Sequence, residues 1–179
     1  MNRLLQGDVG SGKTVVAAIA AVAVAESGLP AGRQGHQTAF MAPTEILARQ
    51  HYQTFRKFFP DFPHGIALLT GNEARLYLGE GLERGAKKVE LQSAIRAGKI
   101  SIAIGTHALI EKGVLFPRLA LVVVDEQHRF GVEQRAALVK DGAAPHFLSM
   151  SATPIPRTLA LTLFGNLNVS QITELPKDR

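Results

Sequence analysis

The amino-acid sequence predicts an α/β fold with a mostly parallel central sheet and helices on both faces. Three observations support this prediction. Strand-like and helix-like segments alternate along the 179 residues, which is the pattern of βαβ units. The run LALVVVDE at 119–126 is nearly continuous in apolar, β-branched residues, as expected of a strand buried on both faces. A glycine-rich turn at 7–12 joins a short apolar run to a long apolar helix.

The first half of the chain contains three expected strands and two expected helices. RLLQ (3–6), TAFMA (38–42) and GIALLT (65–70) are short apolar runs typical of strands. Residues 13–26 predict a buried helix that is apolar on nearly every side, and residues 44–59 predict an amphipathic helix. The predicted inner face of the second helix carries Leu47, His51, Phe55, Phe58 and Phe59.

The second half continues the alternation. The expected strands are ISIAIGT (100–106), LALVVVDE (119–126) and HFLSMSAT (146–153), and VSQITEL closes the chain. The expected helices are VELQSAIRAG, ending at Gly98, a segment at about 131–139, and PRTLALTLFG, with Pro156 near its start and Gly165 after its end. Residues 26–37 predict a loop insertion. Residues 72–88 are rich in glycine and charge and predict no clear element.

The composition limits the classes of protein to consider. Residues 1–179 are the size of one domain. The absence of cysteine excludes disulfides and thiolate metal sites and suits a reducing compartment. No secretory leader is recognisable, and the most apolar stretch, 15–25, is too short for a bilayer, so no membrane partner is expected. The formal charge of +5 is compatible with a polyanionic partner.

The glycine-rich turn fits the pattern G-x-x-x-x-G-K-[ST] of a phosphate-binding loop. Its candidate nucleotide-binding residues are Gly7, Asp8, Val9, Gly10, Ser11, Gly12, Lys13 and Thr14. Backbone N–H groups of such a loop and of the following helix N-terminus face an anion. Lys13 would reach the β- and γ-phosphates, and the Thr14 hydroxyl would ligate Mg²⁺. The alternative is a glycine turn that only begins a helix.

Two carboxylates directly follow the most apolar strand, in VVVDEQH. Beside a phosphate loop, Asp125 is the candidate ligand of a Mg²⁺ that also binds ATP phosphates. Glu126 is the candidate base for the attacking water, and His128 would sense or relay the γ-phosphate. The alternatives are an Asp-Glu turn that caps the next helix and a histidine used in packing or capping.

Several motifs together resemble superfamily-two helicases and translocases. They are GDVGSGKT, APTEILARQHY, GTHALI, DEQHRFGVEQR and SATPIPRTLALT, in that order. They are most similar to the motifs of the bacterial DNA helicases that remodel branched DNA, such as replication forks and recombination intermediates. A translocase that couples transcription to repair shares PIPRTL but differs around the phosphate loop and the acid box. The resemblance spans the whole chain.

This resemblance implies a RecA-like P-loop NTPase lobe that binds ATP and Mg²⁺ and acts on DNA in the bacterial cytoplasm, at the nucleoid. Residues in the positions of the coupling motifs are Gln127, Ser151, Ala152 and Thr153, and those in DNA-facing segments are Thr44, Arg49, Thr106 and His107. From chemistry alone, Thr44 is equally a helix N-cap and Arg49 a solvated helix charge.

The resemblance also implies parts that the sequence does not contain. It covers one lobe of a two-lobed motor, and the second lobe and an upstream DNA-reading wedge domain are not in residues 1–179. We therefore expect a single lobe that is part of a longer or split protein, with weak turnover by itself. The competing hypotheses are a nucleotide-binding module without its own catalysis, a lobe of the transcription-repair translocase, and a small-molecule kinase that uses the same loop.

Overall fold

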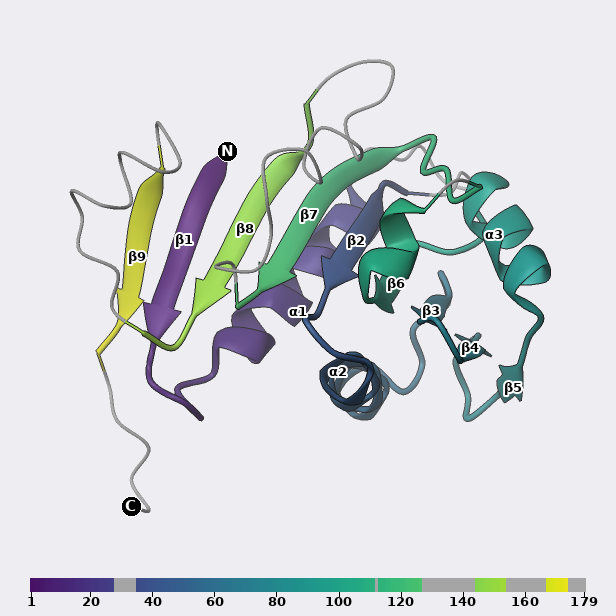
Figure 1. Cartoon of the computed structure of the whole chain (residues 1–179), viewed down its shortest axis with the longest axis horizontal. Coiled ribbons are helices and arrows are strands. Elements are labelled where there is room, and N and C mark those ends of the chain that lie inside the picture. The colour runs from purple at the N-terminus through teal and green to yellow at the C-terminus, as the bar shows by residue number, and fades with distance from the viewer. Residues whose placement is uncertain (28–34, 112, 127–143, 154–166, 174–179) are drawn as a thin grey trace.

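The computed structural model describes residues 1–27, 35–111, 113–126, 144–153 and 167–173. In this part of the chain, nine strands form one sheet in the order β5-β4-β3-β6-β2-β7-β8-β1-β9 (Figure 1). The strands are β1 Asn2–Gly7, β2 Gln37–Met41, β3 Ile66–Leu69, β4 Ala74–Tyr77, β5 Glu83–Gly85, β6 Ile102–Gly105, β7 Leu119–Asp125, β8 His146–Ser151 and β9 Asn168–Ile172. The helices are α1 Lys13–Glu26, α2 Glu45–Phe58, α3 Lys88–Arg96 and the short 3₁₀ helix η1 His107–Ile110.

Most strand pairs are parallel, as predicted. Every pair from β3 through β6, β2, β7, β8 and β1 to β9 is parallel. Only β4 runs against its neighbours, β3 and β5. The central strands β2 and β7 are buried along most of their length, so the apolar, β-branched run of β7 lies where such a sequence is most stable.

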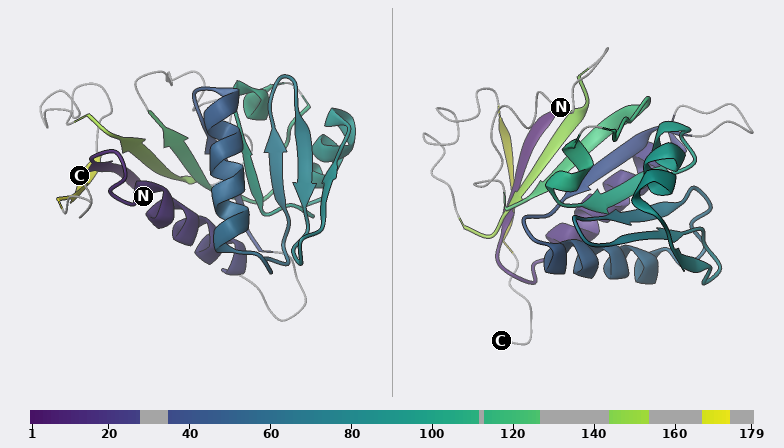
Figure 2. Two further views of the ribbon diagram at one scale, coloured as in Figure 1. Left: turned by 90° about the horizontal axis from the view of Figure 1, so that it is seen from below. Right: turned by 45° about the vertical axis from the view of Figure 1, so that its right-hand side comes forward.

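Helices cover both faces of the sheet, which confirms the predicted layers (Figure 2). Alternate residues of β6 show how the faces are divided. Ile102 and Ile104 pack in the cluster that contains α1 and α2, whereas Ala103 packs in the cluster that contains α3 and η1. This division follows from the two-residue period of a strand.

Two details of the helix predictions are wrong. Helix α1 is not buried all round, because its fully buried stripe consists of alanines and its larger residues Val15, Val16 and Ile19 are 40–57% exposed. Alanine lets the helix approach the sheet closely. Val22 and Val24 still pack against the core, whereas Val15, Val16 and Ile19 face outward. In α2, Phe58 is 42% exposed. The buried side of α2 is formed by Ala48, His51, Tyr52 and Phe55.

The segment 72–88, which predicted no element, contains the antiparallel strands β4 and β5 and the start of α3. Its turn has positive φ at Gly79, Glu80 and Gly81. An ion pair between Arg56 of α2 and Glu83 of β5, at 2.6 Å, ties the hairpin to the helix. Strands this short carry too few residues for a periodic pattern, so the sequence did not indicate them.

The remaining predictions divide into two groups. The VSQITEL segment contributes β9, which pairs with β1. The helices expected at 131–139 and 156–165 lie outside the described residues, as does most of the loop expected at 26–37. None of the described helices is long and apolar enough to cross a membrane.

Candidate functional site

The glycine loop, Asp125 and the Ser-Ala-Thr motif lie at the carboxyl ends of the parallel strands β1, β7 and β8. The register places Gln6 of β1 opposite Ser151 of β8, and Met150 of β8 opposite Asp125 of β7. The glycine loop and the carboxylates therefore follow strands that are separated only by β8, about 10 Å apart at normal strand spacing. Ligands of open α/β sheets bind at this edge.

The glycine loop turns sharply between β1 and α1. Gly10 and Gly12 have φ of 82° and 92°, values that side chains with a Cβ rarely adopt. Gly12 is the N-cap of α1 and its carbonyl accepts from the N–H of Val15 at 2.9 Å. A Cβ at Gly7 would lie 2.5 Å from Ser11 Oγ and 3.2 Å from Ile172 Cβ. The loop is thus closely packed on β9 and exposes the start of a helix, which suits an anion.

Lys13 folds back over this loop. Its Nζ donates to the carbonyl oxygens of Gly7 and Asp8, both at 2.7 Å. The buried Ser11 Oγ has no hydrogen-bond partner in the described part of the chain. The loop thus carries a cation and an unused hydroxyl donor, and both groups can bind phosphate oxygens.

A cavity of about 310 Å³ adjoins the loop. It is lined by Gln6, Gly7, Asp8, Ala152, Gln171, Ile172 and Thr173. A hydrogen bond of 3.1 Å from Gln171 Nε2 to Gln6 Oε1 joins β9 and β1 in its wall. The cavity is within the size range of small-molecule sites, and it places the end of β8 beside the loop.

The carboxylate end of the site has a partner that sequence analysis missed. Asp125 is the last residue of β7, and its Oδ2 lies 2.8 Å from Nε2 of His51 on α2. The two side chains are 13% and 11% exposed. Periodicity placed His51 on the buried face of α2, and a buried imidazole requires a polar partner. The need for a polar partner of His51 was therefore the one indication of this contact in the sequence.

The chain changes direction at Glu126, directly after β7. Glu126 has φ of 52°, a left-handed conformation that is uncommon for a residue with a side chain and that turns the chain away from β7. The predicted sites at Gln127 and His128 lie outside the described residues.

The Ser-Ala-Thr motif forms a closed turn at the end of β8. Ser151 Oγ donates to the carbonyl of Thr153 at 3.0 Å and accepts from the N–H of Thr153 at 3.2 Å. The two hydroxyl oxygens are 3.1 Å apart. With Ala152 in the cavity wall, this turn lies between the glycine loop and the carboxylates. Hydroxyls in such a turn can exchange partners at little steric cost.

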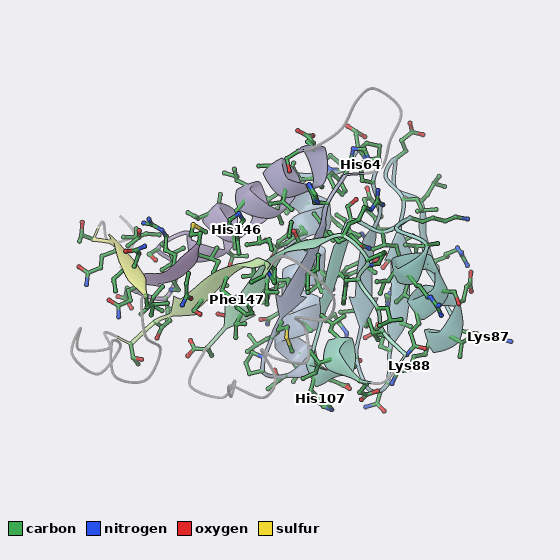
Figure 3. All side chains as sticks on the ribbon, turned by 90° about the horizontal axis from the view of Figure 1, so that it is seen from above. His64, Lys87, Lys88, His107, His146 and Phe147 are labelled. Atoms are coloured by element: carbon green, nitrogen blue, oxygen red, sulfur yellow. The ribbon has the colours of Figure 1, made fainter. Side chains whose placement is uncertain are left out.

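The four residues predicted to face DNA follow β2 and β6 or lie on α2. Thr44 is the N-cap of α2, with its side chain accepting from the N–H of Leu47 at 3.3 Å. The Oγ1 of Thr106 is buried without a partner in the described chain, whereas the His107 side chain is 74% exposed. His107 lies on the same side of the molecule as Lys88 (Figure 3), and both contact Glu111. The contact of Thr44, Arg49, Thr106 and His107 with DNA stays a prediction.

Arg49 is held by an acidic partner. Its Nε and one terminal nitrogen donate to Oε2 of Glu73 at 2.9 and 2.7 Å, and Arg75 contacts the same carboxylate. Burial raises the pKa of Glu73, but hydrogen bonds from Arg49 and Arg75 outweigh it and leave the pKa below its usual value. An Arg49–phosphate contact would therefore have to compete with Glu73.

An open, mostly parallel sheet with a glycine loop before α1 and acids after the central strand is the architecture of a RecA-like P-loop NTPase lobe. The family model of the DEAD/DEAH box helicases matches residues 1–162. The chain belongs to the DEAD/DEAH box helicase family.

Individual relatives agree with this assignment. The chain is 52% identical over its whole length to the ATP-dependent DNA helicase RecG of Synechocystis sp.. A solved structure of RecG bound to a three-way DNA junction has a TM-score of 0.75 and 45% identity, and it covers 100% of this chain. A hypothetical ATP-dependent RNA helicase from Sulfolobus tokodaii shares the fold, with a TM-score of 0.61 over 95% of this chain and 48% of its own.

These comparisons confirm the resemblance to bacterial DNA helicases that the sequence motifs indicated. They also show how little of those proteins this sequence represents. The chain spans 20% of the Synechocystis protein and 22% of the RecG chain in the junction complex. The activity, substrates and partners of a whole RecG protein can therefore only be proposed for this chain.

Proposed function

We propose that this chain is the first ATP-binding motor lobe of a RecG-like helicase, which couples ATP hydrolysis to the remodelling of branched DNA. The observation that carries the proposal is the common position of three motifs. The glycine loop, the Ser-Ala-Thr turn and Asp125 lie at the carboxyl ends of the neighbouring strands β1, β8 and β7. These are the three parts that such a motor needs for binding phosphate, coupling and hydrolysis. The 45% identity to RecG in its junction complex supports the DNA class.

Each part of the loop has a task in this proposal. The N–H groups of residues 8–14 would surround the β- and γ-phosphates. Lys13 would exchange the Gly7 and Asp8 carbonyls for phosphate oxygens, a charge-assisted pairing that is stronger than its present bonds.

The residues present also fit a magnesium ion that arrives with the nucleotide. The described residues contain no group of three or more His, Cys, Asp or Glu that could hold a metal by themselves. Mg²⁺ bound to phosphates keeps several waters and uses only one or two carboxylates. Thr14, at the start of α1, and Asp125, at the end of β7, would hold it. The ion would neutralise charge on the transferring phosphoryl group.

The remaining roles are proposed from the resemblance to superfamily-two helicases. Glu126 would orient and deprotonate water, and His128 would sense the γ-phosphate. Gln127 and the turn of Ser151, Ala152 and Thr153 would transmit hydrolysis to the DNA-facing side, with contacts from Thr44, Arg49, Thr106 and His107. A second motor lobe would supply an arginine finger. We place residues 1–179 as one lobe of such a protein in the bacterial cytoplasm, at the nucleoid.

The substitution Glu126→Gln is expected to keep ATP binding and to lower single-turnover hydrolysis about 100-fold or more, the usual contribution of a general base. Phosphate release from labelled ATP, with binding measured in parallel, tests this. The matched control is Glu80→Gln, because Glu80 has a similar φ of 50° in the β4–β5 turn, far from the site in the sheet order. Equal hydrolysis in the two variants would exclude Glu126 as the base.

A nucleotide-binding module without its own turnover is the second candidate, and the small share of RecG that the chain spans favours it for the chain in isolation. We expect the 179-residue chain to bind Mg·ATP weakly and to release phosphate slower than about 1 s⁻¹ with forked DNA, below the usual enzyme range. A faster DNA-stimulated rate would contradict this expectation.

Two other hypotheses predict different products or substrates. Transfer of phosphate to an acceptor other than water would favour a small-molecule kinase. A lobe of a transcription-repair translocase would be supported if the complete protein acted on stalled RNA polymerase and left forked DNA unchanged.

A further inference from the structure

A histidine on helix α2 is hydrogen-bonded to the carboxylate at the end of the central strand, and the roles given above do not include it. His51 Nε2 and Asp125 Oδ2 are 2.8 Å apart, although the residues are 74 positions apart in the chain. An ionised carboxylate has only acceptor oxygens, so the imidazole Nε2 carries the hydrogen and donates it. The contact engages Oδ2, one of the two carboxylate oxygens of Asp125.

The imidazole is fixed on several sides. His51 is 9% exposed, and its ring packs against Phe40 of β2 with 4.6 Å between ring centroids. It lies near the middle of α2, whose N-terminus is capped by Thr44 and whose Phe55 packs edge-on against the same Phe40 ring. A donor packed in this way favours one orientation of the Asp125 side chain.

We propose that His51 is a positioning residue that holds the Asp125 carboxylate ready for magnesium. The inference rests on the proposed function, because it takes Asp125 as the metal ligand. Residues that orient a metal-ligating carboxylate through a hydrogen bond commonly change metal affinity 10- to 100-fold when they are removed. His51 would act through Asp125 without touching nucleotide or metal.

The proposal gives α2 a direct link to the hydrolysis site. The helix begins beside Thr44 and carries Arg49, two of the residues in DNA-facing segments, and it reaches Asp125 through His51. A displacement of α2 would move the donor and thereby the carboxylate. Sequence motifs alone do not suggest this link, because they assign the two segments to separate tasks.

The test is binding of a fluorescent ATP analogue to the full 179-residue chain, titrated with Mg²⁺ and repeated in EDTA. His51→Ala is expected to raise the Mg²⁺ concentration for half-maximal binding about 10- to 100-fold and to leave binding in EDTA unchanged. His51→Gln should retain most of the Mg²⁺ affinity, because the glutamine amide nitrogen can occupy a position close to that of Nε2.

The matched control is Phe55→Leu, which loosens packing on the same Phe40 ring without touching Asp125. If His51 only stabilised the core, both His51→Ala and Phe55→Leu would lower the unfolding temperature. Neither variant would then change the Mg²⁺ concentration for half-maximal binding of the analogue. That result would overturn the inference. Equal losses in Mg²⁺ and EDTA would also overturn it. A wild-type chain whose analogue binding ignores Mg²⁺ would refute the metal site itself and thus the proposed function.

Discussion

Replacement of Lys13 by alanine is expected to weaken ATP binding about 10- to 100-fold, since a charged hydrogen bond to phosphate contributes about 1.5–3 kcal/mol. Among the described residues, Lys13 Nζ bonds to the carbonyls of Gly7 and Asp8, where water can replace it. The unfolding temperature should therefore change little. Calorimetric titration with Mg·ATP and a thermal melt give the two readouts.

A second lysine provides the control for this substitution. Lys99 is exposed and lies just before β6, at the amino edge of the sheet and away from the loop. Lys99→Ala removes the same charge and should leave ATP affinity unchanged. If the Lys13→Ala and Lys99→Ala variants bound ATP with equal affinity, the glycine loop would have only a structural role.

A large effect on stability is expected from Gly105→Ala. A Cβ at Gly105, the last residue of β6, would lie 2.0 Å from the carbonyl oxygen of Leu69 and 3.0 Å from Leu109 Cγ. The first contact is with the backbone of the neighbouring strand β3, which cannot move without breaking its ladder. We expect a loss of about 3 kcal/mol or more, at the upper end for overpacking. For a domain of this size, that corresponds to roughly 6–12 °C in unfolding temperature.

Gly85→Ala is the matched control in the edge strand β5. A Cβ there would meet nothing within 4 Å, so the substitution should change the free energy of unfolding by less than about 1 kcal/mol. Urea unfolding followed by circular dichroism compares the two variants. Equal midpoints would mean that β6 and β3 are not as close at Gly105 as described.

Sequence analysis predicted the elements with strong local signals. The apolar run of β7 and the glycine loop before α1 occur where they were expected, because burial on two faces and positive φ each demand particular residues at particular places. Helix α1 has the same bounds in the prediction and in the structure, although its exposed valines and isoleucine were not expected. Hydrophobicity alone does not indicate which side of an apolar helix faces a sheet.

The features that sequence analysis missed depend on contacts between distant segments. The hairpin of β4 and β5 is held by partners on β3 and α2, such as Arg56 at Glu83. The His51–Asp125 contact joins two motifs that are separated by 74 positions. Periodicity shows that a side chain points inward, but the strand order is needed to show which side chain it meets.

The pairing of β1 has a consequence for how the protein is made. Both neighbours of β1 in the sheet, β8 and β9, begin after residue 145. During synthesis on the ribosome, β1 must therefore stay unpaired until residues 146–151 of β8 have been made. Contacts over such separations are slow to form, and the unpaired strand is open to association with other nascent chains. Within residues 1–179, the glycine loop should consequently reach its final position only after β8 and β9 have paired with β1.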